Sequence, residues 1–258
     1  MKDKIVPTQN LSGFIALVTS LINKPERMDR MGIICGKWGL GKSTAVQWYF
    51  ANNPCIYVRA MSAWTRSVVM MLEDILRGYR VKPRGRFKSD IRELVRVAKK
   101  SRTPLFIDEA NRVVRKSLLI ETIRDLHDLA RIPIILIGQE DILNLLKRHD
   151  LMPVFSRVTE VFEFKELSAT DIQRVAVELC DLQCDLNVAA LIRTICLGDF
   201  RLVNALLIKA EEICEFNRIG ELTTAVVKDA ASTMPDPENI EAAVRAARGT
   251  PAKIGEAA

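Results

Sequence analysis

The segment GKWGLGKST at residues 36–44 constrains this chain more than any other feature of its sequence. Gly36 and Gly41 stand five residues apart, Lys42 and Ser43 follow at once, and the apolar run MGIIC precedes the segment. A loop with so few side chains lets successive backbone N–H groups converge on phosphate oxygens. A helix that begins directly after it turns its positive end toward the same anion. The pattern therefore predicts a strand, a phosphate-binding loop and a helix.

The residue types in this loop suit the binding of a nucleoside triphosphate. Lys42 supplies a mobile positive charge for the β- and γ-phosphates, and the Ser43 hydroxyl is a ligand for Mg²⁺. A fortuitous glycine turn is the alternative, which the strand before the loop and the helix after it disfavour. The residues expected to line the nucleotide are Gly36, Lys37, Trp38, Gly39, Leu40, Gly41, Lys42, Ser43 and Thr44.

A second motif, LFIDEA at 105–110, ends an apolar run in two acids. Such acids are costly to bury unless they face a site. Asp108 is predicted to hold Mg²⁺, directly or through water, and Glu109 to act as the general base that polarises the attacking water. A solvated corner at a strand end is the alternative. The Asp-Glu pair favours hydrolysis over transfer of the phosphoryl group to a metabolite.

Apolar runs alternate with helical periodicity up to about residue 165, which indicates a parallel sheet covered on both faces. After about residue 166 the strands stop, and Ser168 is expected to cap the first of several helices. We therefore predict an α/β domain over 1–165, a small helical domain over 166–234 and a loosely ordered tail over 235–258. Strands are expected at 31–35, 55–60, 103–111, 132–138 and 157–164, and helices at 10–24, 43–52, 62–78, 88–100 and 117–131.

Composition narrows the class of protein. No apolar run approaches the roughly 18 residues that span a bilayer, and the N-terminus MKDKIVPTQN lacks the apolar core of a secretory signal. A cytoplasmic protein is therefore expected, in the bacterial host cytoplasm if the chain is phage-encoded. The six cysteines match no common zinc spacing and are expected to be reduced and mostly buried.

Positive charge is concentrated in one stretch. Residues 77–102 hold 11 lysines and arginines against Asp90 and Glu93, a net charge of +9, whereas the whole chain carries +6. A local excess of this size suggests a polyanion as partner. The alternative is a solvated basic loop without a partner.

Together the two motifs, their spacing and the helical C-terminal region resemble the AAA+ ATPases. The segments that carry the resemblance are GKWGLGKST, PLFIDEAN, IILIGQED, PVFSRVTEVFEFKEL and LGDFRLVNALL, in the order of that superfamily. Within it, the chain looks most like the ATP-dependent target-selection proteins of transposons, such as the B protein of phage Mu. Secretion ATPases of the ExeA type are close cousins. The resemblance implies ATP and Mg²⁺ as ligands and an ATPase activity that DNA and assembly stimulate.

The resemblance also assigns roles to single residues. Gln139 occupies the place of the polar residue that senses the γ-phosphate, where the family usually has Asn, Ser or Thr. Arg157 matches the arginine finger that reaches the γ-phosphate of a neighbouring subunit, and Arg148 is a second candidate. Arg201 matches the second sensor arginine of the helical lid. The alternative for each arginine is a surface residue without a catalytic role.

Filaments or rings of ATP-bound subunits around double-stranded DNA, which activate a transposase, are a further implication of the resemblance. In this clade the elements after the second strand line the inner surface of the oligomer. The Mu protein carries a helix-turn-helix appendage before its ATPase domain, and this sequence leaves no room for one, so the ATPase domain itself is expected to bind DNA. The expected phosphate contacts are Arg59, Arg66, Arg80, Lys82, Arg84, Arg86 and Lys88.

Three other functions stay open from the sequence. A secretion-type assembly ATPase requires a membrane or peptidoglycan partner. A small-molecule kinase requires an arginine-rich lid and a pocket for the phosphate acceptor. A nucleotide switch with weak hydrolysis is the third. ATP hydrolysis that DNA stimulates, without a phosphorylated product, separates the transposition protein from the kinase.

Overall fold

The computed structural model describes residues 2 and 4–234, and its contacts divide the chain into two compact units. An α/β unit comprises residues 11–38 and 42–165, and a helical unit comprises the described residues of 1–10, 39–41 and 166–258. The segment predicted as a tail, 235–258, lies outside the described residues.

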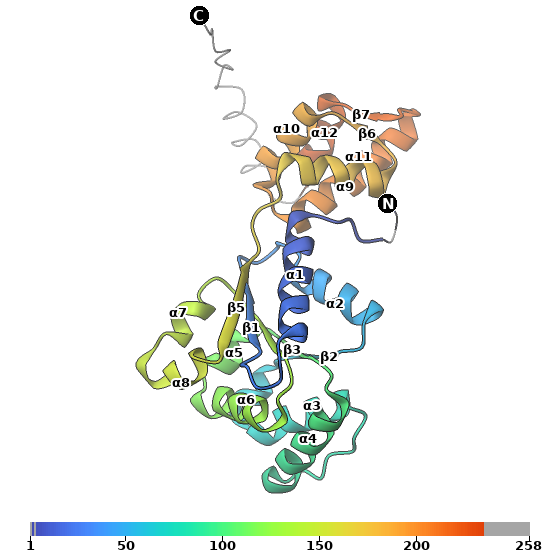
Figure 1. Ribbon diagram of the computed structural model, residues 1–258. Coiled ribbons are helices and arrows are strands. Elements are labelled where there is room, and N and C mark those ends of the chain that lie inside the picture. The colour runs from blue at the N-terminus through green and yellow to red at the C-terminus, as the bar shows by residue number, and fades with distance from the viewer. Residues whose placement is uncertain (1, 3, 235–258) are drawn as a thin grey trace, which may run out of the picture. The chain divides into compact units, whose positions relative to one another are not determined.

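Five parallel strands form the sheet of the α/β unit, in the order β2-β3-β4-β1-β5 (Figure 1). Strands β1, β3 and β4 are buried along their whole length, because helices cover both faces of the sheet. This arrangement confirms the predicted α/β architecture. The strands are β1 (Met31–Cys35), β2 (Ile56–Arg59), β3 (Leu105–Asp108), β4 (Ile134–Ile137) and β5 (Val158–Glu163).

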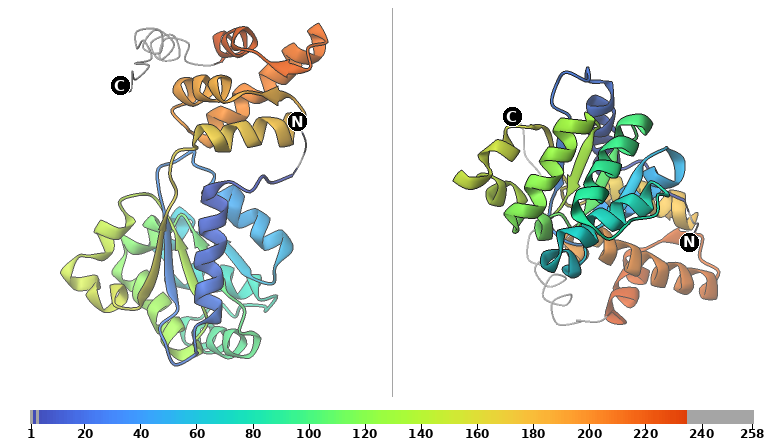
Figure 2. Two further views of the ribbon diagram at one scale, coloured as in Figure 1. Left: turned by 45° about the horizontal axis from the view of Figure 1, so that its top comes forward. Right: turned by 90° about the horizontal axis from the view of Figure 1, so that it is seen from below.

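One face of the sheet is covered by α1 (Gln9–Asn23) and α2 (Lys42–Asn52). Helix α1 lies alongside the strands in Figure 1 and in the left view of Figure 2. The rings of Phe14, Tyr49 and Phe106 pack against one another here, with centroids 5.4 to 6.3 Å apart. These three aromatic side chains join the two helices to β3.

The opposite face packs on α3 (Val68–Gly78), α4 (Phe87–Ser101) and α6 (Ser117–Ala130). Alternation along β1 sends Met31, Ile33 and Cys35 into this larger core, together with side chains of the three helices. Short elements complete the unit: α5 (Asn111–Val114), α7 (Ile142–Leu146), α8 (Met152–Phe155) and the 3₁₀ turns η1 (Ser62–Arg66) and η2 (His149–Leu151).

The single helix predicted over 62–78 is divided at Ser67. This residue has an extended backbone (φ −153°, ψ 114°), so η1 ends before it and α3 begins after it. The turn lets Trp64 enter the core at 1 % exposure, and its indole N–H donates to Asp74 Oδ2 at 2.7 Å. Burial of one large aromatic side chain therefore overrides the local helical periodicity.

The helical unit contains α9 (Ala169–Cys180), α10 (Leu186–Cys196), α11 (Phe200–Asn217) and α12 (Thr224–Ser232). Each helix begins with a side-chain cap, and the predicted Ser168 cap is part of a capping box with Asp171. Asp171 also accepts from the Gln9 backbone N–H at 3.1 Å, which ties the N-terminal segment to this unit. Residues 1–10, expected within the α/β domain, thus pack with the helices instead.

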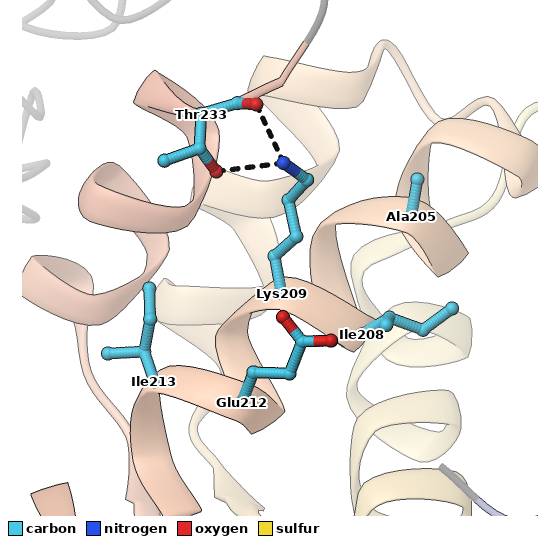
Figure 3. Close-up of a pocket in the computed structure, with 6 residues that line it drawn as sticks. All are labelled: Ala205, Ile208, Lys209, Glu212, Ile213 and Thr233. Atoms are coloured by element: carbon cyan, nitrogen blue, oxygen red, sulfur yellow. Dashed lines mark hydrogen bonds between the residues drawn. The ribbon is translucent and has the colours of Figure 1, made fainter. Parts of the chain in front are cut away.

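A two-stranded parallel pair, β6 (Gln183–Cys184) and β7 (Glu221–Leu222), adds to the helices of this unit. Strands of two residues show no periodicity, so the sequence did not reveal them. The unit also has a cavity of about 460 Å³ beside α11 and α12. Figure 3 shows the Lys209 ammonium there, donating to the Thr233 carbonyl at 2.6 Å and to its hydroxyl at 3.0 Å.

All six cysteines are buried and none forms a disulfide, as predicted. Burial raises the pKa of the Cys55 thiol to about 11, so the thiol is protonated at neutral pH. Among the described residues, no helix combines the length and the apolar character of a bilayer span.

Phe14→Ala should lower the free energy of unfolding by about 3–5 kcal/mol, because it leaves a cavity between α1 and the sheet. Urea denaturation followed by circular dichroism measures the change. Phe50→Ala is the matched control, since Phe50 is half-exposed, and it should cost about 1 kcal/mol or less. Equal losses in the two variants would show that the aromatic cluster does not stabilise the unit.

Candidate active site

Three sequence motifs meet at one edge of the sheet because parallel strands end on the same side. The glycine loop follows β1, the acidic pair ends β3, and Gln139 follows β4. Backbone hydrogen bonds fasten the segments that leave the strands: Gly138 N–H donates to the Ile34 carbonyl at 2.9 Å, and Ala110 N–H to the Ile137 carbonyl at 2.8 Å. The carboxyl edge of the sheet is therefore the candidate active site.

The glycine loop adopts a conformation that needs its glycines. Gly36, Gly39 and Gly41 have φ angles of +142°, +79° and +85°. A Cβ atom on Gly36 would lie 2.7 Å from the Phe164 carbonyl oxygen, so no other residue fits that position. Of the other loop residues, Leu40 is buried, whereas Lys37, Trp38 and Thr44 are exposed. This backbone can approach a phosphate closely.

Lys42 begins α2 and lies over the loop. Its ammonium donates to the carbonyl of Gly36 at 2.7 Å and to the carbonyl of Lys37. Burial lowers the pKa of Lys42, and the negative charge of Asp108 partly opposes this shift. The ammonium is thus held by weak neutral acceptors, which the oxygens of a phosphate can replace.

The Ser43 hydroxyl donates to Asp108 Oδ2 at 2.8 Å, which joins the glycine loop to β3. A hydroxyl and a buried carboxylate so placed are the oxygen ligands that Mg²⁺ prefers, and the predicted metal ligands therefore fit that ion. Residue Asp108 is further held by the Glu109 backbone N–H, which donates to Oδ1 at 2.8 Å. This carboxylate has one fixed orientation.

Tyr57 is a site residue that sequence reasoning missed. Its hydroxyl, on β2, donates to Asp108 Oδ2 at 2.9 Å. Burial, followed by the charge of Asp108, raises the pKa of Tyr57, so the hydroxyl keeps its proton and stays a donor. Neighbouring strands place Tyr57 beside Phe106 in the register, but no motif marks the residue in the sequence.

Glu109 has a strained backbone and a paired side chain. Its φ is +55°, in the left-handed region that a glutamate rarely adopts. Its Oε1 accepts from the Arg59 guanidinium at 3.1 Å, and this hydrogen bond raises the pKa of Arg59. The Arg59 side chain is 65 % exposed, so the pair is a surface ion pair, a class that contributes only about 0–1 kcal/mol. Another anion can therefore take the place of Glu109 on Arg59.

Asn111 is a second residue that the sequence did not single out. It is buried, and its Oδ1 accepts from the Gln139 backbone N–H at 2.7 Å. Its amide nitrogen donates to Asp141. Asn111 thus joins the segment after β3 to the segment after β4 and holds the backbone of Gln139 at the carboxyl edge, where the Gln139 side chain is exposed.

Arg157 lies at the amino edge of the sheet, whereas the glycine loop and the acidic pair lie at the carboxyl edge. It directly precedes β5, whose first residue pairs with Met31 at the start of β1, so about 16 Å of strand separates it from the glycine loop. Its guanidinium donates to Asp128 Oδ2 at 3.0 Å and to the Pro153 carbonyl at 2.9 Å. The other finger candidate, Arg148, pairs with Asp150 at 2.9 Å.

His127 and Asp128 belong with Asp29 to a group of side chains whose spacing suits a metal ion. Both ring nitrogens of His127 are already engaged, however. Nε2 accepts from the Arg30 backbone N–H at 3.1 Å, and Nδ1 lies 3.0 Å from Asp128 Oδ1. Because Nε2 accepts, Nδ1 carries the proton, and the histidine is a structural link rather than a metal ligand.

Arg201 stands in the first turn of α11, in the helical unit. Its backbone N–H donates to Asp199 Oδ1 at 2.8 Å and to the carbonyl of Gly39 at 3.1 Å, and its side chain is exposed. Gly39 belongs to this unit by its contacts. The sensor role of Arg201 stays a prediction.

The expected DNA contacts fall into two groups. Arg59 ends β2 at the carboxyl edge, and Arg66 ends the turn η1 that follows this strand. The others, Arg80, Lys82, Arg84, Arg86 and Lys88, are exposed in and just after the α3–α4 connection, which begins near the amino ends of β2 and β3. Buried Asp90 accepts from the backbone N–H groups of Arg84 at 2.9 Å and Arg86 at 3.1 Å, so this basic turn has a defined backbone.

Comparison with known proteins agrees with this fold. Residues 26–146 match a family model described as an AAA domain, and no curated protein matches the chain by sequence. The chain is similar to the solved structure of the Aeropyrum pernix ORC2 protein in its ADPNP–ADP complexes, with a TM-score of 0.68 and 16 % identity, over 90 % of this chain and 70 % of that chain.

Two further solved structures show the same likeness. The Aeropyrum pernix ORC1 protein in complex with DNA has a TM-score of 0.58 and 16 % identity, over 89 % of this chain and 69 % of that chain. The Thermotoga maritima RuvB Holliday junction branch migration motor has a TM-score of 0.55 and 18 % identity, over 95 % and 78 %. The chain therefore has the α/β fold of the AAA+ P-loop ATPases, followed by a helical C-terminal region.

Tyr57→Phe should weaken binding of ATP in Mg²⁺ by about tenfold, because it removes a donor that orients the metal-binding carboxylate. In EDTA the affinity should not change. Titration with a fluorescent ATP analogue measures both constants. Tyr79→Phe is the matched control, since its hydroxyl faces the Thr103 carbonyl at 3.5 Å. An equal loss with and without Mg²⁺ would contradict a role in orienting the metal ligand.

Proposed function

We propose that this protein is a Mg²⁺-dependent ATPase that assembles on double-stranded DNA when ATP is bound and presents that DNA to a transposase. The observation that carries the proposal is the ion pair between Arg59 and Glu109. It joins a candidate DNA contact to the candidate general base. An ATPase that responds to DNA requires a link of this kind.

The hydrolytic part rests on the residues at the carboxyl edge. Lys42 and the loop N–H groups bind the phosphates, and Ser43 and Asp108 hold Mg²⁺, which neutralises developing charge on the phosphate oxygens. Glu109 polarises the attacking water, and Gln139 hydrogen-bonds that water or a phosphate oxygen. The oriented Asp108 and the strained Glu109 support this assignment, because preorganised groups lower the cost of reaching the transition state.

The link to DNA follows from the competition for Arg59. While Arg59 binds Glu109, the carboxylate has a fixed cation and is a poor base for water. A DNA phosphate carries the same charge as the carboxylate and forms a comparable ion pair with the guanidinium. When Arg59 moves to the phosphate, Glu109 is released toward the nucleotide. DNA binding would thereby accelerate hydrolysis.

Assembly is proposed from the position of Arg157. It lies at the edge of the sheet opposite the glycine loop, which supports a role at the site of a neighbouring copy rather than at its own. A planar and permanently charged guanidinium suits contact with a γ-phosphate. Arg201 is proposed to contact the γ-phosphate of its own subunit. ATP would then stabilise the oligomer, and hydrolysis would release it.

DNA as the polyanion is supported by charge and by the comparisons. The chain is similar in fold to ORC1, solved in complex with DNA, and to the branch migration motor RuvB. Two groups of exposed cations occur on each subunit, and an oligomer repeats them along the duplex. They give no sign of base recognition, so binding is expected to be largely independent of sequence.

The transposase as partner rests on the sequence resemblance to the Mu family. The alternative is an assembly ATPase of the secretion type or another nucleotide switch of this fold. A strand-transfer reaction with the cognate transposase separates them. Stimulation of transfer into DNA that carries this protein and ATP supports the proposal, and an unchanged rate argues for the alternative.

Duplex DNA binding should require ATP, weaken steeply with salt and disappear in Lys42→Ala. Fluorescence anisotropy with a labelled duplex measures affinity, and electron microscopy with ATP and with ADP shows the assembly. Filaments or rings are expected only with ATP. Binding of equal strength with ATP, with ADP and without nucleotide would contradict the proposal.

Arg59→Ala should raise the ATPase rate without DNA several-fold and reduce the further stimulation by DNA, because Glu109 loses its competing partner. Steady-state phosphate release with and without duplex measures both rates. Arg77→Ala is the control, since Arg77 pairs with Glu73 and Asp74 away from the site. If DNA stimulates Arg59→Ala and the unaltered protein by the same factor, Arg59 does not couple the two activities.

A further inference from the structure

A cavity of about 210 Å³ lies where η1 meets the segment before α6. We propose that it binds a phosphate group of the DNA backbone, an inference that rests on the proposed function and adds Lys116 to the DNA contacts. The residues that line the cavity are Trp64, Thr65, Arg66, Ser67, Val68, Lys116, Ser117, Leu118 and Leu119.

Two cations without partners give the cavity its charge. Arg66 and Lys116 are exposed, and neither forms an ion pair or a side-chain hydrogen bond with any residue in the described part of the chain. Two other arginines of the same segments do have partners. Arg59 pairs with Glu109, and Arg115 pairs with Asp141 at 3.0 Å. The two arginines that have partners therefore have their charge balanced within the protein, and the two cations of the cavity do not.

Among residues 2 and 4–234, no carboxylate lines the cavity. Two lining residues bond to carboxylates outside the lining, and each carboxylate already pairs with an arginine. The Trp64 indole N–H donates to Asp74, which pairs with Arg77, and the Ser117 hydroxyl donates to Asp150 Oδ2 at 3.3 Å, which pairs with Arg148 at 2.9 Å. A pair of cations in a hollow without acids is unfavourable unless an anion balances them. This imbalance points to an anionic ligand.

The hydrogen-bond donors of the cavity suit a phosphate in particular. The Ser67 hydroxyl makes no hydrogen bond to a described residue, and it faces the cavity beside the first turn of α3. Both α3 and α6 begin at this wall, after residues whose side chains do not cap them. Their first N–H groups add neutral donors to the two cations, as a tetrahedral oxyanion requires.

The position of the cavity beside the Arg59–Glu109 pair favours DNA as the source of the phosphate. Arg66 follows the strand that ends in Arg59, and Lys116 follows the segment that begins with Glu109. A DNA strand with one phosphate in the cavity therefore lies on the same two segments as the Arg59–Glu109 pair. The larger cavity of the helical unit offers no such site, because Glu212 lines it and Thr233 already binds its lysine (Figure 3).

The test compares two double variants that lose the same charge. Arg66→Ala/Lys116→Ala removes the cations of the cavity. Arg27→Ala/Lys147→Ala removes two exposed cations elsewhere in the α/β unit that bond to no other side chain among the described residues. Affinity for a labelled duplex is measured with ATP over a range of salt concentrations. The cavity variant should bind at least tenfold more weakly at physiological salt, and its salt slope should fall by about 0.9, the value for one phosphate contact.

The control should keep the affinity and slope of the unaltered protein. The circular dichroism spectrum and melting temperature of both variants should match those of the unaltered protein, which shows that they fold. An unaltered protein that fails to bind DNA in any nucleotide state would overturn the proposed function itself. Normal binding by the unaltered protein together with equal binding by the two variants would overturn only the cavity's role.

Inorganic phosphate distinguishes the two sources of the ligand. Its effect on the melting temperature is measured for the unaltered protein and for the cavity variant. Stabilisation that only the unaltered protein shows, combined with unchanged DNA binding by the variant, would assign the cavity to free phosphate and overturn the inference. Loss of DNA affinity in the cavity variant alone supports it.

Discussion

The hydrogen bond from the Ser43 hydroxyl to Asp108, 2.8 Å long, is the contact on which the candidate site depends. It joins the end of the glycine loop to β3, two segments that are 65 residues apart in the chain. Tyr57 reaches the same carboxylate oxygen from β2. A buried acid costs free energy unless donors surround it, and here the donors are supplied by the elements that a nucleotide and Mg²⁺ would contact. These donors give the carboxylate a defined orientation at the carboxyl edge.

Glu109, the next residue, is held quite differently. Its backbone has an unfavourable positive φ, and its side chain pairs with an exposed arginine. Strain of this kind persists only where the surrounding structure enforces it, as the sheet does at the end of β3. The pair with Arg59 is weak and open to exchange with another anion. The predicted metal ligand is thus fixed while the predicted general base is free to change partner, a division of properties that suits the proposed regulated hydrolysis.

The cations of the α/β unit likewise differ in whether a partner within the chain holds them. Some have their charge balanced by a carboxylate of the chain, as Arg157 does through Asp128 at 3.0 Å. Others pair with no carboxylate in the described part of the chain: Arg66 and Lys116 at the carboxyl edge are examples. The basic turn differs from both groups. Asp90 accepts hydrogen bonds from backbone N–H groups of the turn, and the basic side chains of the turn stay exposed. An oligomer would repeat these unbalanced charges at a regular interval along a polyanion.

Patterns of neighbouring residues were enough to predict the strand–loop–helix around Lys42, the acidic end of β3, the parallel sheet and the helices after residue 166. These features depend on local spacing, on apolar runs and on caps such as Ser168, which neighbouring residues decide. The break at Ser67, the packing of residues 1–10 with the helices and the pair β6–β7 depended on tertiary contacts instead. So did the roles of Tyr57, Asn111 and Lys116. Tyr57 and Asn111 bond to residues of another strand or loop, and Lys116 lines a cavity with residues of η1. Only the register of the sheet and the burial of Trp64 decide which side chains meet.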